Sequence, residues 1–272
     1  MATPTTVTVR VIAKAGKFLG ADIAGALVTI HDALTGELLA SGNTQGGSGP
    51  ADLMCVAITR LQTLPTDGAS FFTTVLHLNA PRLIKVTARG PNGSLQSANT
   101  VSATQWVVPG KDITGGTGLL LEIPGMQVQI QEPATHLNLS GTAPYTVNIL
   151  ANITMMCGCP ISNDTVWLPS LFDVGAMIRQ LDVDSSGTDV LAASFPLKFT
   201  GTTSQFAGSW KFSPASTPAY YELIVYAFQP SNGNSGMDRV TFFVSYQFGR
   251  KILRGERLKA ARPLKGYELV MD

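Results

Sequence analysis

The sequence has few charged residues and no long hydrophobic run, and both shortages exclude classes of protein. Charged residues make up 14% of the 272 residues, and 19 basic against 18 acidic side chains leave a net charge of +1. Nucleic-acid binding needs a concentrated excess of Lys and Arg, so we expect no nucleic acid among the partners. A membrane-spanning helix needs about 18 or more consecutive apolar residues, and none is present, so we expect no membrane span. The first residues do not resemble a signal peptide, which leaves the compartment open.

Histidine is also scarce, which makes a catalytic site hard to assemble. The chain has three histidines, His31, His77 and His136. It contains neither a Gly-x-Ser-x-Gly motif nor a His-Glu-x-x-His motif. We therefore expect a protein that is not an enzyme and that needs no cofactor.

Cysteine is present only three times, and an odd number is a poor basis for a disulfide framework. Cys157 and Cys159 are separated by one glycine, so a bond between them would close a small and strained ring. Cys55 lies in the apolar run Leu-Met-Cys-Val-Ala, and we expect it to be a buried free thiol without a catalytic role.

What the sequence does contain is alternation of apolar and polar residues, interrupted by turns. Alternating runs typical of half-buried strands occur at 7–13, 26–32, 221–228 and 239–247. The 27 Gly and 16 Pro residues favour many short strands joined by turns. The segment 52–64 has the apolar spacing of a helix, and its β-branched residues keep a strand possible. The predicted fold class is all-β, with two tandem Greek-key β-sandwich domains and a C-terminal arm.

The boundary between the two sandwiches is expected close to Pro124. The segment 109–118 is dense in glycine, and Pro124 and Gly125 follow the next short strand. We therefore expect a first sandwich over 1–124, a second over 125–247 and an arm over 248–272.

Each half carries features of a known sandwich family. In the first half these are the strand Gly-Ala-Leu-Val-Thr-Ile-His at 25–31, the turn Thr35-Gly36, a glycine turn at 44–47 and the strand at 83–90. On these residues the first half resembles the transthyretin-like or carboxypeptidase-regulatory-like β-sandwich. The second half resembles a bacterial immunoglobulin-like or fibronectin-type sandwich, on its strand number and its last hairpin. Both resemblances imply a binding, spacer or assembly module.

The segment Met-Met-Cys-Gly-Cys at 155–159 is the densest group of soft ligands in the chain. Thioethers suit Cu(I), and thiolates suit both Cu(I) and Zn(II). As an alternative function, Met155, Met156, Cys157 and Cys159 would bind copper or zinc, with His136 from a neighbouring loop as a further ligand. The simpler interpretation is that these residues pack in the core, because Met and Cys are ordinary core residues.

The last 25 residues carry a net positive charge that the rest of the chain lacks. The segment 248–272 holds seven basic and three acidic residues, with apolar residues between them. We expect it either to bind a protein partner or a second copy, or to be a solubilising extension or a last strand folded back on the body. The predicted partner-binding residues are Arg250, Lys251, Arg254, Arg257, Arg262, Tyr267 and Leu269.

Together these features predict a non-catalytic structural or interaction protein. We expect an assembly or accessory subunit of a larger complex or surface structure, and hence an oligomer or complex subunit. A protein that handles copper or zinc through the segment 155–159 is the alternative.

Overall fold

The structure is a computed structural model that describes residues 1–50, 62–181, 189–215 and 218–245. The described residues contain no α-helix and are mostly β-strand, so the predicted all-β fold class is confirmed. No helix among them is long and apolar enough to cross a membrane. The predicted helix at 52–64 falls mostly outside the described residues, as do Cys55 and the arm. The strands are β1 (Thr3–Ala13), β2 (Leu27–Asp32), β3 (Leu38–Asn43), β4 (Gln45–Ser48), β5 (Ala69–Leu78), β6 (Arg82–Gly90), β7 (Asn99–Val107), β8 (Leu119–Ile123), β9 (Met126–Glu132), β10 (Leu137–Leu139), β11 (Tyr145–Met155), β12 (Asp173–Leu181), β13 (Val190–Pro196), β14 (Lys198–Phe199), β15 (Gln205–Phe212), β16 (Ala219–Gln229) and β17 (Asn234–Val244).

Strands β1 to β8 form the first unit, a sandwich of two four-stranded sheets. One sheet has the order β4-β5-β1-β8 and the other the order β3-β2-β6-β7. The alternation seen in the sequence sets which side chains face inward, since Val7, Val9 and Val11 of β1 are fully buried. They pack in the same core as Val28 and Ile30 of the opposite sheet.

Strands β9 to β17 form the second unit, also with two sheets. The first has the order β14-β15-β11-β9, and the second has the order β10-β17-β16-β12-β13. Most neighbouring strands are antiparallel, but the short β10 pairs in parallel with β17. In the first unit, β1 and β8 are likewise a parallel pair.

The hairpin predicted at the end of the second unit is present, but its second strand begins earlier than expected. Strand β17 begins at Asn234, which pairs with Gln229 at the end of β16. The backbone N–H groups of Asn232 and Gly233 donate to the carbonyl oxygen of Gln229 and close the turn between the strands. The turn is therefore shorter than the gap between the predicted strands at 221–228 and 239–247, and Asn234 lies at the end of the hairpin next to this turn.

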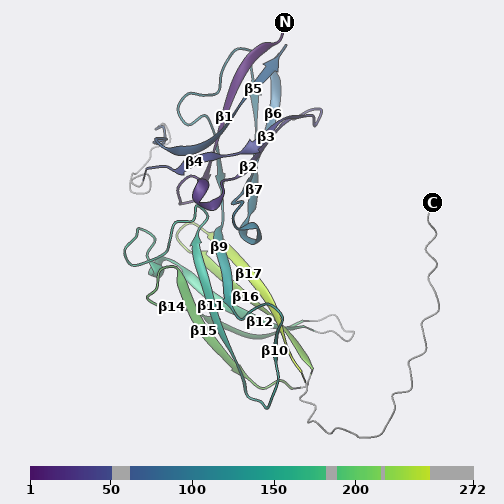
Figure 1. The fold of residues 1–272 in the computed structure, drawn as a ribbon, viewed down its shortest axis with the longest axis vertical. Coiled ribbons are helices and arrows are strands. Elements are labelled where there is room, and N and C mark those ends of the chain that lie inside the picture. The colour runs from purple at the N-terminus through teal and green to yellow at the C-terminus, as the bar shows by residue number, and fades with distance from the viewer. Residues whose placement is uncertain (51–61, 182–188, 216–217, 246–272) are drawn as a thin grey trace, which may run out of the picture.

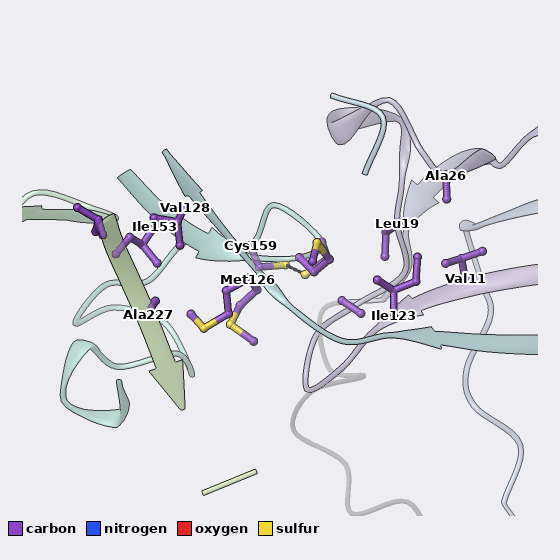
Figure 2. Packing of buried hydrophobic residues seen from close by; sticks show 14 of the residues in the cluster. Val11, Leu19, Ala26, Ile123, Met126, Val128, Ile153, Cys159 and Ala227 are labelled. Atoms are coloured by element: carbon purple, nitrogen blue, oxygen red, sulfur yellow. Dashed lines mark hydrogen bonds between the residues drawn. The ribbon is translucent and has the colours of Figure 1, made fainter. Parts of the chain in front are cut away.

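The two units lie end to end along the long axis of the molecule (Figure 1). Strand β8 belongs to the first unit and β9 to the second, and Pro124 and Gly125 join them. The buried hydrophobic residues of both units belong to one continuous cluster. Figure 2 shows this continuity, with Ile123 and Leu19 on the side of the first unit, Met126 and Val128 on the side of the second, and Cys159 near the middle. A large apolar contact of this kind restrains the relative motion of two units.

Candidate functional site

The connection between the units is held by the side chain of Asn234, which is buried at the start of β17. Its Oδ1 accepts a hydrogen bond from the Gly125 N–H at 2.7 Å, and its Nδ2 donates to the Gly125 carbonyl oxygen at 2.9 Å. One amide side chain thus satisfies both polar groups of the linker backbone, which would otherwise be buried without partners. Sequence reasoning missed the role of this residue, because nothing local distinguishes it from the other polar residues between the two predicted strands.

The turn that follows β1 contacts the second unit through hydrogen bonds. Lys14 Nζ donates to the carbonyl oxygen of Asn232 at 2.9 Å. The indole Nε1 of Trp167 donates to the carbonyl oxygen of Ala15 at 3.0 Å. These hydrogen bonds come from two different loops of the second unit, so the turn is held from two sides.

A third contact crosses the junction from the short 3-10 helix η3 (Leu95–Ser97). The hydroxyl of Ser97 accepts a hydrogen bond from the Val128 N–H at 3.2 Å and donates to the Val128 carbonyl oxygen at 3.3 Å. Asn99 Nδ2 also donates to the carbonyl oxygen of Pro124 in the linker. With the contacts of Asn234 and of the turn, these hydrogen bonds surround the linker and hold it from several sides.

The two neighbouring cysteines lie at this same junction, in the turn after β11. The Gly158 N–H donates to the Met155 carbonyl oxygen, and the Met155 N–H donates to the Cys159 carbonyl oxygen, so the chain reverses tightly. Gly158 has a φ of +80°, which glycine adopts without strain. The turn brings the Sγ atoms of Cys157 and Cys159 to 2.9 Å from each other. Both are free thiols and buried.

The close contact makes the two thiols chemically unequal. Either can donate the hydrogen bond while both are protonated. The bond from the Cys159 thiol lowers the pKa of Cys157, and the backbone N–H of Lys17 lowers it further, against the effect of burial. The same bond, together with burial, raises the pKa of Cys159. The first negative charge on the pair therefore resides on Cys157.

The other predicted metal ligands have packing contacts of their own, and His136 lies far from the thiol pair. Met155 is buried opposite Met126 of β9, and Met156 packs against the linker at Gly125. His136 contacts Thr241, five residues along β17 from the glycine that faces Met126. A strand rises about 3.3 Å per residue, so His136 is about 16 Å from the junction along β17. Among the described residues, no three His, Cys, Asp or Glu side chains gather closely enough to hold a metal ion.

The outer face of the sheet β10-β17-β16-β12-β13 is rich in apolar side chains. Tyr220, Phe228 and Met237 are each more than a third exposed there. The Tyr220 ring stacks on the Phe243 ring. Both rings border a hollow of about 330 Å³ at the end of the sheet far from the junction, where His136 also lies. The described part of the chain ends at residue 245, two residues after Phe243.

A cluster of charged side chains lies in the middle of this face, between the apolar residues at its two ends. The Glu222 carboxylate accepts from Arg179 at 3.2 Å and lies 3.6 Å from a guanidinium nitrogen of Arg239. Arg179 also contacts Asp189 at 2.6 Å. Because Glu222 is almost fully buried on a face that is otherwise open, the two arginines provide the partners that its charge needs.

The predicted partner-binding residues of the arm all lie outside the described part of the chain. Their role therefore stays a prediction from the sequence. The residues concerned are Arg250, Lys251, Arg254, Arg257, Arg262, Tyr267 and Leu269.

Comparison with known proteins gives little beyond the fold. No protein-family model matches the sequence, and no curated protein matches it. A solved structure of fibronectin(III)-like modules of Clostridium thermocellum CbhA is similar over 81% of this chain and 78% of that chain, with 13% identity and a TM-score of 0.27. A TM-score this low leaves the family of each unit open, and the sheets themselves define the fold.

Proposed function

We propose that this chain is a non-catalytic structural or interaction protein that serves as an assembly or accessory subunit of a larger complex or surface structure. Its two sandwiches act as one rigid spacer. The arm at 248–272 binds a protein partner or a neighbouring copy. In this proposal the second unit is an immunoglobulin-like module and the first a transthyretin-like module, as their sequence features suggest.

The observation that carries the proposal is the way in which the units are joined. A chain whose units moved independently would be expected to have an exposed, polar linker with few contacts. Here Gly125 is buried, and Asn234 binds both of its backbone polar groups. The hydrophobic cluster also runs through the junction without interruption. Such a junction suits a protein that keeps its two ends at a fixed separation.

The apolar face of the second unit supports a binding role. Exposed aromatic residues that gather on one sheet face, bordered by charged residues, are typical of surfaces that bind proteins. Tyr220 and Phe243 lie close to the point where the described chain ends, so a partner bound by the arm is brought near this face.

Removal of the arm tests the proposal. The full chain and a variant ending at residue 248 are compared by sedimentation velocity over a range of concentrations and by co-purification from the native source. We expect the truncated chain to keep its melting temperature, because β17, the last strand of the described residues, ends at Val244, before the arm begins. We also expect it to lose self-association or its co-purifying partner.

A matched variant keeps the length of the arm and changes only its charge. Substituting Arg254→Glu together with Arg257→Glu should weaken the same association, because basic residues speed the encounter with an acidic surface. If the truncated chain associates as the full chain does, the arm does not mediate assembly. If it unfolds, the arm is part of a core.

A metal-handling role is the second candidate, and the observation that favours it is the contact between the two thiols. Two thiolates are half of the ligands that a structural zinc site needs, and Cu(I) accepts fewer ligands. Metal analysis of the purified chain tests this role. Stoichiometric copper or zinc that is lost in the Cys157→Ser, Cys159→Ser double variant would support it, and a metal-free native protein would exclude it.

A further inference from the structure

The thiol pair at the junction is prepared for a reaction that the proposed function does not use. A disulfide bond is about 2.05 Å long, so the two Sγ atoms, 2.9 Å apart, need to approach by only about 0.9 Å. The turn that holds them is fixed by its own backbone hydrogen bonds, from the Gly158 N–H to the Met155 carbonyl oxygen and from the Met155 N–H to the Cys159 carbonyl oxygen.

The surroundings of the pair restrict its chemistry to small reagents. Cys157 is fully buried, whereas Cys159 keeps 7% of its surface exposed. A side chain built on Gly16 of the first unit would come within 3.0 Å of Cys157 Sγ, so this glycine lets the two units approach closely around the sulfur. A bulky disulfide such as glutathione would need the junction to open, whereas a small hydroperoxide needs far less space, and Cys159 is the more exposed member of the pair.

We propose that Cys157 and Cys159 form an oxidisable dithiol that hydrogen peroxide converts to a disulfide, and that the junction between the two units responds to this change. The proposal is independent of the arm and of the partner. It assigns a modification site to residues that the proposed assembly role uses only for packing.

The reaction balances with one peroxide molecule. The Cys157 thiolate attacks one peroxide oxygen, the O–O bond breaks, and the proton from the thiol leaves with the second oxygen as water. This gives a sulfenic acid on Cys157. Cys159 then attacks the Cys157 sulfur, and its proton leaves with the sulfenic oxygen as a second water. Two thiols are oxidised to one disulfide, and one peroxide is reduced to two waters.

The reaction is coupled to the junction through the first unit. The Lys17 N–H points at the Cys157 sulfur, and Gly158 lies against Ile23, so both contacts cross between units. Disulfide formation draws the two sulfurs together by about 0.9 Å and fixes the Cys157 side chain in the ring, so oxidation alters the contact between the Cys157 sulfur and the Lys17 N–H. The closed ring is small and strained, and strained disulfides are the more easily reduced ones. The modification is therefore reversible.

Counting thiols in the full-length protein tests the proposal. The protein is treated with hydrogen peroxide, denatured, labelled with N-ethylmaleimide and weighed as an intact chain. The reduced chain carries three cysteines and takes three labels, and we expect the oxidised chain to take one, at Cys55. Dithiothreitol should restore three labels. Hydrogen–deuterium exchange of the segment 14–23 should be faster in the oxidised form.

Single substitutions identify the residues that take part. After peroxide treatment the Cys55→Ser variant should still take two labels fewer than its reduced form, because Cys157 and Cys159 are both present. Cys159→Ala should instead stop at a sulfenic acid on Cys157, which dimedone captures. If peroxide leaves all three thiols free to react, or if two labels are still lost in Cys159→Ala, the assignment of this pair is wrong. If the disulfide forms but exchange at 14–23 is unchanged, the coupling to the junction is wrong.

Discussion

The two units have the same architecture but build their interiors from different side chains. The first unit is filled with aliphatic residues, such as Val9, Ile30 and Ile84, all fully buried. The second has an aromatic group at its far end, where Trp210 stacks on Phe212 with ring centres 3.8 Å apart. Tyr221 and Phe242 complete this group, with their rings also stacked. In a core of branched aliphatic residues, the packing is shared among many similar side chains. In an aromatic group, it is concentrated in a few large rings that contact one another in specific geometries. The second unit therefore depends more on individual residues than the first.

The units also differ in how they satisfy buried polar groups. In the first unit the hydroxyls of Thr44 and Ser70 both donate to the carbonyl oxygen of Leu19, deep inside the sandwich. In the second unit the buried Glu222 lies on the outer face between two arginines. A hydroxyl needs few hydrogen-bond partners and so can be satisfied inside a closed sandwich. The Glu222 carboxylate needs charged partners, and it finds them on an outer sheet face that a binding partner can still cover.

The largest expected effect comes from removing an aromatic side chain. Phe242→Ala should cost about 3–5 kcal/mol of unfolding free energy, whereas Ile30→Val in the first unit should cost about 0.5–1.5 kcal/mol. Because the cluster is continuous, both variants should unfold in one transition. Thermal melts followed by circular dichroism and by tryptophan fluorescence check this. Two separate transitions in the unsubstituted protein would show that the units are independent.

The next effect concerns the junction itself. Asn234→Ala leaves the N–H and carbonyl groups of Gly125 buried without partners, which should cost about 2–4 kcal/mol. The matched control is Asn148→Ala, on an exposed position of β11, which should stay within about 0.5 kcal/mol of the unsubstituted chain. Chemical denaturation measures both. Equal stabilities of the two variants would contradict the role of Asn234.

Substitutions at two glycines distinguish the cost of backbone strain from the cost of a clash between the units. Gly158 and Gly36 have almost the same φ, +80° and +79°. Alanine at either position should cost about 1–2 kcal/mol for the left-handed backbone. A side chain at 158 would also lie 2.6 Å from Ile23 Cγ2, whereas one at 36 meets nothing within 4 Å. Gly158→Ala should therefore cost about 1–3 kcal/mol more, and Ile23→Ala in that background should recover part of the loss. Equal costs at the two positions would rule out the contact.

The smallest expected effect is a pH dependence confined to the first unit. The backbone N–H groups of Thr35 and Leu34 donate to the Asp32 carboxylate and lower its pKa, and Arg82 lowers it further. Because the folded pKa lies below the unfolded one, this stabilisation is complete above the unfolded pKa and is lost as the pH falls through the folded pKa. Melting temperatures measured from pH 6 down to pH 2 should show a drop that Asp32→Asn reduces. An unchanged profile in that variant would contradict it.

Alternation along the chain was enough to predict most strands, because half-buried strands repeat every two residues. Strand β10, with only three residues, and the glycine-containing β4 had no such pattern. Strand β11 ends at Met155, and the tight turn at Gly158 follows it, which no alternation of apolar and polar residues indicates. This turn, rather than alternation along a strand, brings the two thiols together.

Contacts between segments far apart in the chain could not be predicted from the sequence. The predicted metal ligand His136 lies near Thr241, far from the thiol pair, because the parallel pairing of β10 with β17 fixes its place. The role of Asn234 depends on where the linker passes, and no local pattern encodes that path. The strands were therefore predictable, and the junction was not.

The directions of β1 and β17 have a mechanical consequence. Strand β1 runs from the N-terminal pole to the junction, and β17 runs from the junction toward the opposite pole (Figure 1). A pulling force applied at residues 3 and 244 would act along both strands. It would therefore act across the backbone hydrogen bonds that join each strand to its neighbours. Such a force loads all the bonds of a ladder in shear at once, rather than opening them one by one from an end. Tension along the long axis would therefore be resisted by whole ladders of backbone hydrogen bonds in both units.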